Sequence, residues 1–264
     1  MLLLASKDDH TLQTLIDIAY QEAFSFFSSN NLLVNSAKTE LMVIGKAAGT
    51  SFTVNGIKDK DTMKLIGLTF DNKLSFMPHA QNLVRQVAGK LAGLKKLCAW
   101  ANFSLCVSVA KSLILSKLYR LLEVMGQSHS IQVILQKSMN HVLRVITKGN
   151  RYSSISSMLL QCDLLNVENQ CRFQTYLWFR KCMLEDVSSF TRSLVTDFDS
   201  RTRSTSFKLN FIPRLKASEH SFVYQGVKIF TELNESGRIF TSTKEMKTIY
   251  RQKLLNNHAN GNVV

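Results

Sequence analysis

The sequence predicts an α+β fold that is mostly α, in which a small antiparallel sheet with one helix precedes a helical bundle and an irregular C-terminal extension. Proline supports a helix-rich chain, because only Pro78 and Pro213 occur in 264 residues, where average usage gives roughly 13, and proline breaks helix interiors. The hydrophobic period also changes near residue 75, from short strand-like runs to the 3.6-residue repeat of helices. We therefore expect three domains, residues 1–72, 73–186 and 187–264.

The first segment is expected to begin with a helix at residues 11–27, where apolar side chains recur at i, i+3, i+4 and i+7. Ser6, Asp8 or Asp9 is expected to cap this helix, because a short side-chain oxygen accepts hydrogen bonds from free first-turn amides. Three short runs with strand character follow, at residues 40–44, 51–57 and 64–70. Together they predict the small antiparallel sheet.

From residue 75 onward the apolar pattern predicts four helices. The first three are marked by Leu83, Val84, Val87, Leu91, Leu94 and Cys98, by Leu105, Val109, Leu113 and Leu118, and by Ile131, Leu135, Val142, Val145 and Ile146. Residues 111–124 are apolar on several sides, which is typical of a helix buried in a bundle. The fourth helix covers residues 167–184, with Phe173, Leu177 and Trp178 inward. In the extension we expect a strand at 207–212 and short helices at 221–233 and 243–255.

Positive charge is concentrated in the expected bundle. The chain carries 33 Lys and Arg against 19 Asp and Glu, a formal net charge of +14, which favours a polyanionic partner. Residues 73–160 hold twelve of the bases and a single acid, Glu123. Solubilising helices usually alternate both signs, so this imbalance predicts contact with nucleic-acid backbone, which carries no sequence information. The first candidates are Arg85, Lys90, Lys95, Lys96 and Lys111.

Other classes of protein find little support. No run approaches the roughly 18 apolar residues that span a bilayer, and the opening MLLLAS is shorter than a signal peptide and lacks its basic flank. We therefore expect an intracellular chain with no membrane contact, in either nucleus or cytoplasm. The five cysteines and six histidines show no common zinc spacing. We expect reduced thiols, no metal site and no small-molecule substrate.

Three clusters together resemble the reverse transcriptases of non-LTR (LINE-like) retrotransposons. The first is NLLVNSAKT at residues 31–39, which is similar to the element that closes the palm subdomain of the family. The second is KLIGLTFD at residues 64–71, with LSF at 74–76 and His79, similar to the stretch where the primer-grip strands lead into the thumb helices. The third, RTR at 201–203 and SFVYQGVK at 221–228, resembles the tail that follows the thumb.

The resemblance implies a role for each part. Residues 1–72 would be a palm remnant, the basic helices a thumb-like domain that packs against the backbone of a duplex or an RNA–DNA hybrid, and residues 187–264 an extension. Lys38 would lie near the nucleotide phosphates, and Gly67 would let the backbone approach the primer end. For these two residues a solvated lysine and a plain sheet glycine are the structural alternatives. The family's Mg²⁺ is expected only in an intact member, so we expect no cofactor here.

The sequence departs from the family at its catalytic centre. Polymerase chemistry uses two metal ions held by carboxylates, and the family's aromatic-Ala-Asp-Asp hairpin is absent; the chain is expected to begin just after it. Asp8 and Asp9 are adjacent, but Lys7 and His10 flank them, so we expect a cap or a surface pair and no polymerase activity. Two alternatives stay open: a helical nucleic-acid-binding module kept without catalysis, and the relic of a decayed element.

Overall fold

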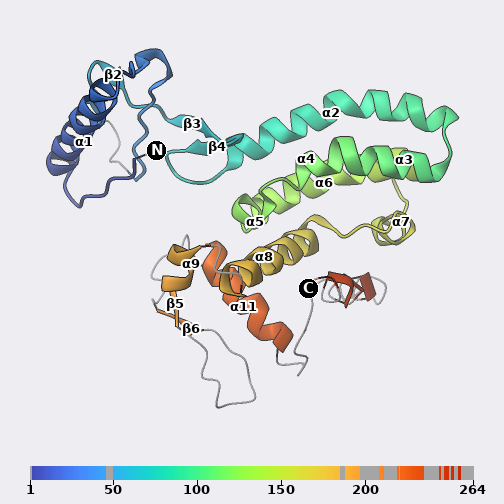
Figure 1. Cartoon of the computed structure of the whole chain (residues 1–264). Helices are drawn as coiled ribbons and strands as arrows, with labels where there is room; N and C mark the ends of the chain where they lie inside the picture. The colour runs from blue at the N-terminus through green and yellow to red at the C-terminus, as the bar shows by residue number, and fades with distance from the viewer. Residues whose placement is uncertain are drawn as a thin grey trace. The chain divides into compact units, whose positions relative to one another are not determined.

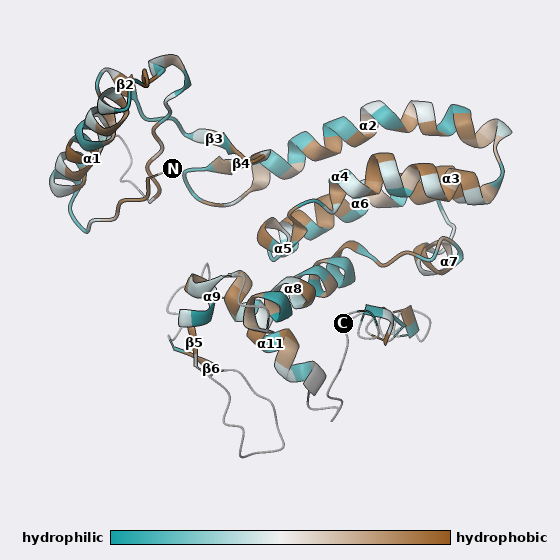
Figure 2. Cartoon of the chain, viewed as in Figure 1, coloured by the Kyte–Doolittle hydropathy of each residue, from teal (hydrophilic) through white to brown (hydrophobic). Residues whose placement is uncertain are grey.

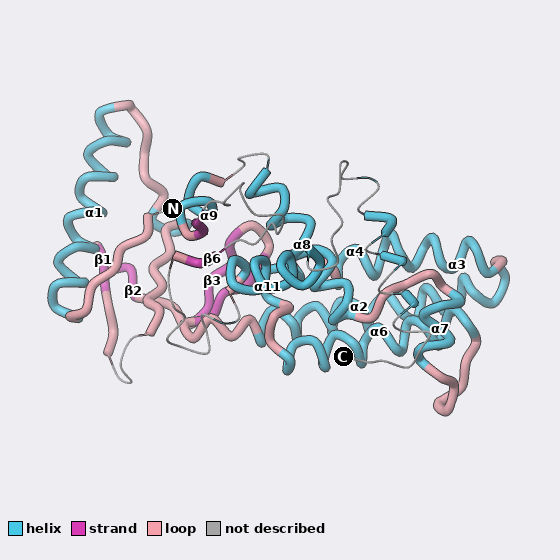
Figure 3. The backbone as a smooth tube through the Cα atoms, turned by 90° about the horizontal axis from the view of Figure 1, so that it is seen from below, coloured by secondary structure: helices cyan, strands magenta, loops and turns pink. Residues whose placement is uncertain are grey.

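The computed structural model describes residues 2–45, 50–184, 188–196, 208–210 and 221–234, together with residues 219, 244, 247–249, 251–252 and 255–256. The chain forms two compact units, Met1–His79 and Ala80–Val264. The described part is α+β and mostly helical, as the sequence predicts (Figures 1 and 3). The boundary between the units falls within the first turn of α2 (Met77–Trp100).

The first unit is built on α1 (Asp9–Ser29), which Asp8 caps. The Asp8 carboxylate accepts hydrogen bonds from the Thr11 amide at 2.8 Å and the Thr11 hydroxyl at 2.9 Å. The hydrogen bond from the Thr11 amide lowers the pKa of Asp8 below its usual value, and the bond from the Thr11 hydroxyl adds to this effect. The capping role expected for this part of the chain is therefore confirmed for Asp8.

Two of the three expected strands are hairpins, which corrects the prediction. Residues 51–57 were expected as one strand, but β1 (Thr53–Val54) turns at Asn55-Gly56 and pairs with β2 (Ile57–Lys58). Residues 64–70 likewise divide into β3 (Thr62–Leu65) and β4 (Leu68–Asp71). Both turns are two residues long with positive φ at both positions, the geometry that matches the twist of hairpin strands.

The expected strand at 40–44 is reduced to one isolated bridge, in which Leu41 pairs with Asp59 in the parallel direction. Its neighbour Val43 is nevertheless buried, and it joins Ile16 of α1, Phe52 and Val54 in one small apolar cluster. A short 3-10 helix, η1 (Ser36–Lys38), connects α1 to this region. The cluster covers one face of α1 and leaves several of its aromatic side chains exposed. Those exposed side chains are Phe24, Phe26 and Phe27.

The second unit continues from α2 into a helical bundle. Its next elements are α3 (Phe103–Ala110), the π-helical η2 (Lys111–Leu115), α4 (Ser116–Leu118), α5 (Leu122–Met125), α6 (His129–Thr147) and α7 (Ile155–Gln161). Apolar residues dominate α3, whereas α2 mixes polar and apolar positions (Figure 2). The fully buried centre comes from several of these helices: Leu118, Leu122, Ile131, Leu135 and Leu143.

The apolar segment 111–124 is not one helix, contrary to expectation. A wide π-helical turn opens it, α4 ends at Leu118, and Leu121 adopts a left-handed φ of 58° before α5 begins. Leu105 and Leu113 are also exposed, while Cys106, Ala110 and Ile114 are buried. A run that is apolar all round fits several registers, and packing against the neighbouring helices selects among them.

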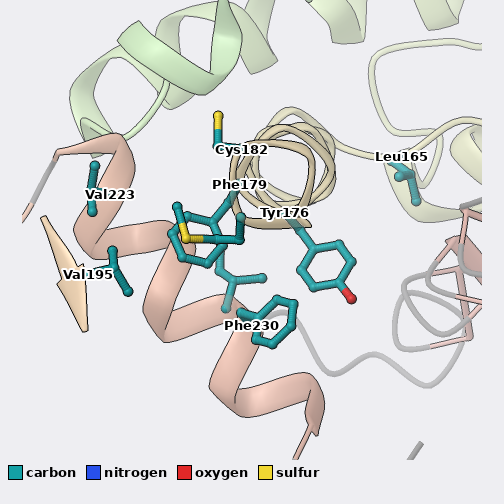
Figure 4. Packing of buried hydrophobic residues seen from close by; sticks show 9 residues of the cluster. Leu165, Tyr176, Phe179, Cys182, Val195, Val223 and Phe230 are labelled. Carbon is teal, nitrogen blue, oxygen red and sulfur yellow. The ribbon is translucent and has the colours of Figure 1, made fainter. Parts of the chain in front are cut away.

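The remainder of the unit packs on α8 (Val167–Leu184), whose bounds match the prediction. It is followed by α9 (Ser189–Ser193), by β5 (Val195–Thr196) paired with β6 (Lys208–Leu209), and by α11 (Phe222–Asn234). Tyr176 and Phe179 of α8 pack against Phe230 of α11 (Figure 4). Trp178, expected inward, is 45% exposed, because α11 covers the face beside it. The expected helix at 243–255 lies largely outside the described residues.

Candidate nucleic-acid interface

A cationic cleft lies between α2 and α6. It has a volume of about 650 Å³. Lys95 contributes from α2, and Arg144 and Lys148 contribute from the C-terminal end of α6. None of the described lining residues is acidic. The remaining lining residues are small or apolar: Ala88, Leu91, Ala92, Cys98, Ala99, Val145 and Gly149.

The end of α6 positions two of the three cations. Lys148 leaves the helix with a left-handed φ of 54°, and the Gly149 amide donates to the Arg144 carbonyl at 3.1 Å. Arg144 and Lys148 are four residues apart and therefore lie on the same side of the helix end. Cations at a helix C-terminus are stabilised by the negative end of the helix dipole. The local sequence can thus keep two positive charges side by side without an acid.

Arg144 carries an unsatisfied donor. Its Nε–H is buried and has no hydrogen-bond partner within the described part of the chain. A buried donor without a partner costs about 1–3 kcal/mol, and more when the group is charged. Most buried donors are paired for this reason. The donor capacity of the Arg144 guanidinium is therefore not fully used within the described part of the chain.

The base of the cleft is apolar, and the one thiol among its described lining residues, that of Cys98, is poorly reactive at neutral pH. Cys98 is buried, and burial raises the pKa of its thiol to about 12; the neighbouring Cys106 thiol adds to this rise, and the charge of Lys148 opposes it. A thiol with so high a pKa is a poor nucleophile at neutral pH, so Cys98 is not a reactive group of this cleft.

The single acid of residues 73–160 lies far from this cleft. Glu123 belongs to α5, which precedes α6, whereas Lys148 follows the other end of that 19-residue helix. The 19-residue α6 alone is about 28 Å long, and α5 lies at the end of the bundle away from the α2–α3 turn (Figure 1). Burial raises the pKa of Glu123. It does not neutralise the cleft.

The five lysine and arginine candidates do not form one patch. Lys95 lines the cleft, and Arg85 and Lys96 are exposed on α2. Lys90 turns toward the other neighbour of α2, where its Nζ donates to the Leu113 carbonyl at 3.0 Å. Desolvation and the nearby Lys117 lower the pKa of Lys90. Lys111 lies near Cys162, whose pKa burial raises to about 11 against the opposing charge of that lysine.

The two candidates from the first unit occupy separate elements. Lys38 is exposed at the end of η1, where its amide donates to the Asn35 carbonyl at 3.0 Å. Gly67 is the second residue of the β3–β4 turn, with a φ of 84°. That conformation favours glycine for local reasons, so the turn alone accounts for the residue.

Residues of the second family-like cluster fix the loop between the β3–β4 hairpin and α2. The Asp71 carboxylate accepts from the amides of Phe76 at 2.8 Å and Ser75 at 3.2 Å. Burial raises the pKa of Asp71, but its hydrogen bonds with Ser75 and Phe76 outweigh this effect and lower it overall. In the described structure these residues therefore fix the conformation of the loop between β4 and α2.

The described residues offer neither a metal site nor a membrane-spanning helix. No group of three or more His, Cys, Asp or Glu side chains there is placed to hold a metal ion. None of the described helices combines the length and the apolar character needed to cross a bilayer. Comparison of the chain with protein-family profiles, curated proteins and solved structures finds no match.

Proposed function

We propose that the helical unit of this chain binds the sugar–phosphate backbone of nucleic acid without reading sequence, and that the chain is part of a reverse transcriptase of the non-LTR type. The cleft between α2 and α6 carries the first half of the proposal. Lys95, Arg144 and Lys148 line it with no acid among the described lining residues, and the buried Nε–H of Arg144 lacks an acceptor there. Phosphate oxygens suit these three cationic side chains, and arginine can bind a phosphate through two donors at once.

The family part rests on the sequence clusters at residues 31–39, 64–79 and 221–228 and on their order along the chain. The described form of the second cluster, a hairpin that runs directly into a long helix, is compatible with it. In such an enzyme Lys38 would approach the nucleotide phosphates, and Gly67 would lie beside the primer end. The 264 residues contain no aromatic-Ala-Asp-Asp sequence, and Asp8 is engaged as a helix cap. We therefore assign no polymerase chemistry to this chain by itself.

A non-catalytic nucleic-acid-binding module is the second candidate, and the same cleft supports it. The two candidates share the binding activity and differ in whether it serves DNA synthesis. The third alternative, the relic of a decayed element, differs from both, because such a chain is not expected to bind nucleic acid. The first experiment therefore tests whether the cleft binds nucleic acid.

The test is fluorescence anisotropy with a labelled RNA–DNA hybrid over a range of salt concentrations. If about five phosphates are neutralised, counterion release gives a log–log slope of about −4.5 for a B-form duplex, and a steep slope of the same sign for the hybrid. Lys95→Glu and Lys148→Glu should weaken binding to unrelated sequences equally, because backbone contacts do not distinguish bases.

Lys137→Glu is the matched control for these charge reversals. Lys137 is exposed on α6 as well, but it lines a different groove, in which Glu168 already supplies a negative charge. This variant should bind nearly as the parent does. A flat salt response, or Lys95 and Lys148 variants that bind like the parent, would overturn the proposed function.

A further inference from the structure

The end of the bundle beside the cleft exposes two aromatic rings. Trp100, the last residue of α2, is 94% exposed, and Tyr152, in the turn after α6, is 92% exposed. Large aromatic side chains usually contribute to cores and interfaces, where they bury 150–250 Å² each. These two rings are covered by no described part of the chain.

Both aromatic residues are close in sequence to residues that line the cationic cleft. Ala99 and Gly149 are lining residues; Trp100 follows the first directly, and Tyr152 follows the second by three positions. In Figure 1 the turn between α2 and α3 and the start of α7 lie at the same end of the bundle. Trp100 is five residues beyond Lys95, so it lies about 7.5 Å farther along the axis of α2 and about 140° around it. A strand that contacts both residues would therefore pass over the C-terminal end of α2.

The backbone beneath Tyr152 is well defined by its own hydrogen bonds. The Asn150 side-chain oxygen accepts from the Tyr152 amide at 2.9 Å, and the Ser153 hydroxyl accepts from the Asn150 amide at 3.0 Å. Arg151 is exposed between them. The ring therefore projects from an ordered turn, next to a further positive charge.

Exposed aromatic faces beside uncompensated cations are the combination that holds single strands. Unpaired bases stack on aromatic side chains with little regard to sequence, while a basic groove follows the backbone. Inside a duplex the bases are already stacked on each other, so they are not free to stack on the rings. The cations also favour a polyanion over a neutral apolar partner, because charge complementarity guides the association.

We infer that this end of the bundle binds a single-stranded nucleic-acid segment, with its phosphates on Lys95, Arg144 and Lys148 and one base stacked on Trp100. Tyr152 offers a second stacking surface. This inference rests on the proposed function and adds to it a preference for unpaired nucleotides at one place. The tip of the bundle would thus hold a strand at the point where it leaves a duplex.

Tryptophan fluorescence tests the inference directly. The chain has only two tryptophans, so Trp178→Phe leaves Trp100 as the one reporter. Oligothymidylate should quench this fluorescence at moderate salt, while a blunt duplex of equal length should not. Trp100→Ala should weaken binding of the single strand by about tenfold and leave binding of the blunt duplex within about twofold. Phe190→Ala, at another exposed aromatic of the same unit, should change neither.

The outcomes separate this inference from the proposed function. If neither nucleic acid binds, the proposed function falls and this inference falls with it. If the duplex binds with a steep salt dependence but oligothymidylate leaves Trp100 unquenched and Trp100→Ala has no effect, only this inference is overturned. A Trp100 signal that follows protein concentration but not oligonucleotide would assign the rings to contact with a second copy of the chain, and would also overturn it.

Discussion

The Nδ1 atom of His79 lies 3.3 Å from the backbone nitrogen of Thr69 and accepts its hydrogen bond. His79 is buried in the first turn of α2, and Thr69 belongs to β4, so this bond ties the hairpin to the helix start. We expect His79→Ala to lower the free energy of unfolding by about 1–3 kcal/mol, because the Thr69 amide loses its acceptor. Urea denaturation measures the change. His10→Ala, at an exposed position of α1, is the control; equal losses in the two variants would contradict the assignment.

Asp71 should make the stability of the connection depend on pH. Its pKa in the folded chain is lowered below the ordinary value of 3.8, so its contribution is present above that value and is lost as the pH falls through the folded pKa. Asp71→Asn should cost about 1 kcal/mol at neutral pH, and the gap to the parent should close on acidification below about pH 4. Denaturation curves at several pH values test this. Asp9→Asn, at an exposed carboxylate, should show a much smaller gap; a gap for Asp71→Asn that is unchanged at low pH would refute the prediction.

Gly226 allows α11 to approach α8. A Cβ atom at this position would overlap the ring of Phe179, which is fully buried. Gly226→Ala should therefore destabilise the unit by about 1–3 kcal/mol through overpacking. Gly93→Ala is the matched control, since a Cβ atom there meets open space, and it should be neutral or stabilising by up to about 1 kcal/mol. Thermal denaturation of both variants distinguishes a packing effect from a general glycine effect.

The thiol of Cys98 should resist alkylation in the folded chain. Burial, with the Cys106 thiol beside it, raises the pKa of Cys98 from 9.0 to about 12, so little thiolate is present at pH 8. Stability should be fully present below pH 9 and should fall as the pH rises toward 12, because the unfolded chain then ionises more readily. Mass spectrometry after native-state iodoacetamide treatment measures the modification. Alkylation of Cys98 at the rate seen in denaturant would contradict this picture.

Long periodic segments could be predicted from the sequence. The bounds of α8 match those expected, and α1, α2 and α6 appear where the 3.6-residue pattern places them. Short turns could be recognised only in part. Asn55-Gly56 is a common hairpin dipeptide, whereas Ile66 at a φ of 51° is unexpected, since branched side chains disfavour that region.

The cationic cleft could be predicted from the sequence only in part. The charge imbalance points to the bundle, and Lys95 is among the expected contacts. Arg144 and Lys148 are spaced to share one side of α6, but the spacing alone does not show which helix they face. That pairing is set by tertiary packing across about fifty residues, and the charge count holds no information about it.

The π-helical turn at Lys111–Leu115 has a consequence for the length of the chain. The Ser116 amide reaches back to the Lys111 carbonyl, so this turn holds one residue more than an α-helical turn would. Deleting one residue here, such as the exposed Ser112, would restore α-helical hydrogen bonding. Because the extra residue is taken up within this single turn, its loss would leave the following residues facing nearly as they do now, with Leu118 still in the centre that it fills. This turn is therefore a point at which the chain can lose one residue without turning the next helical segment away from the core.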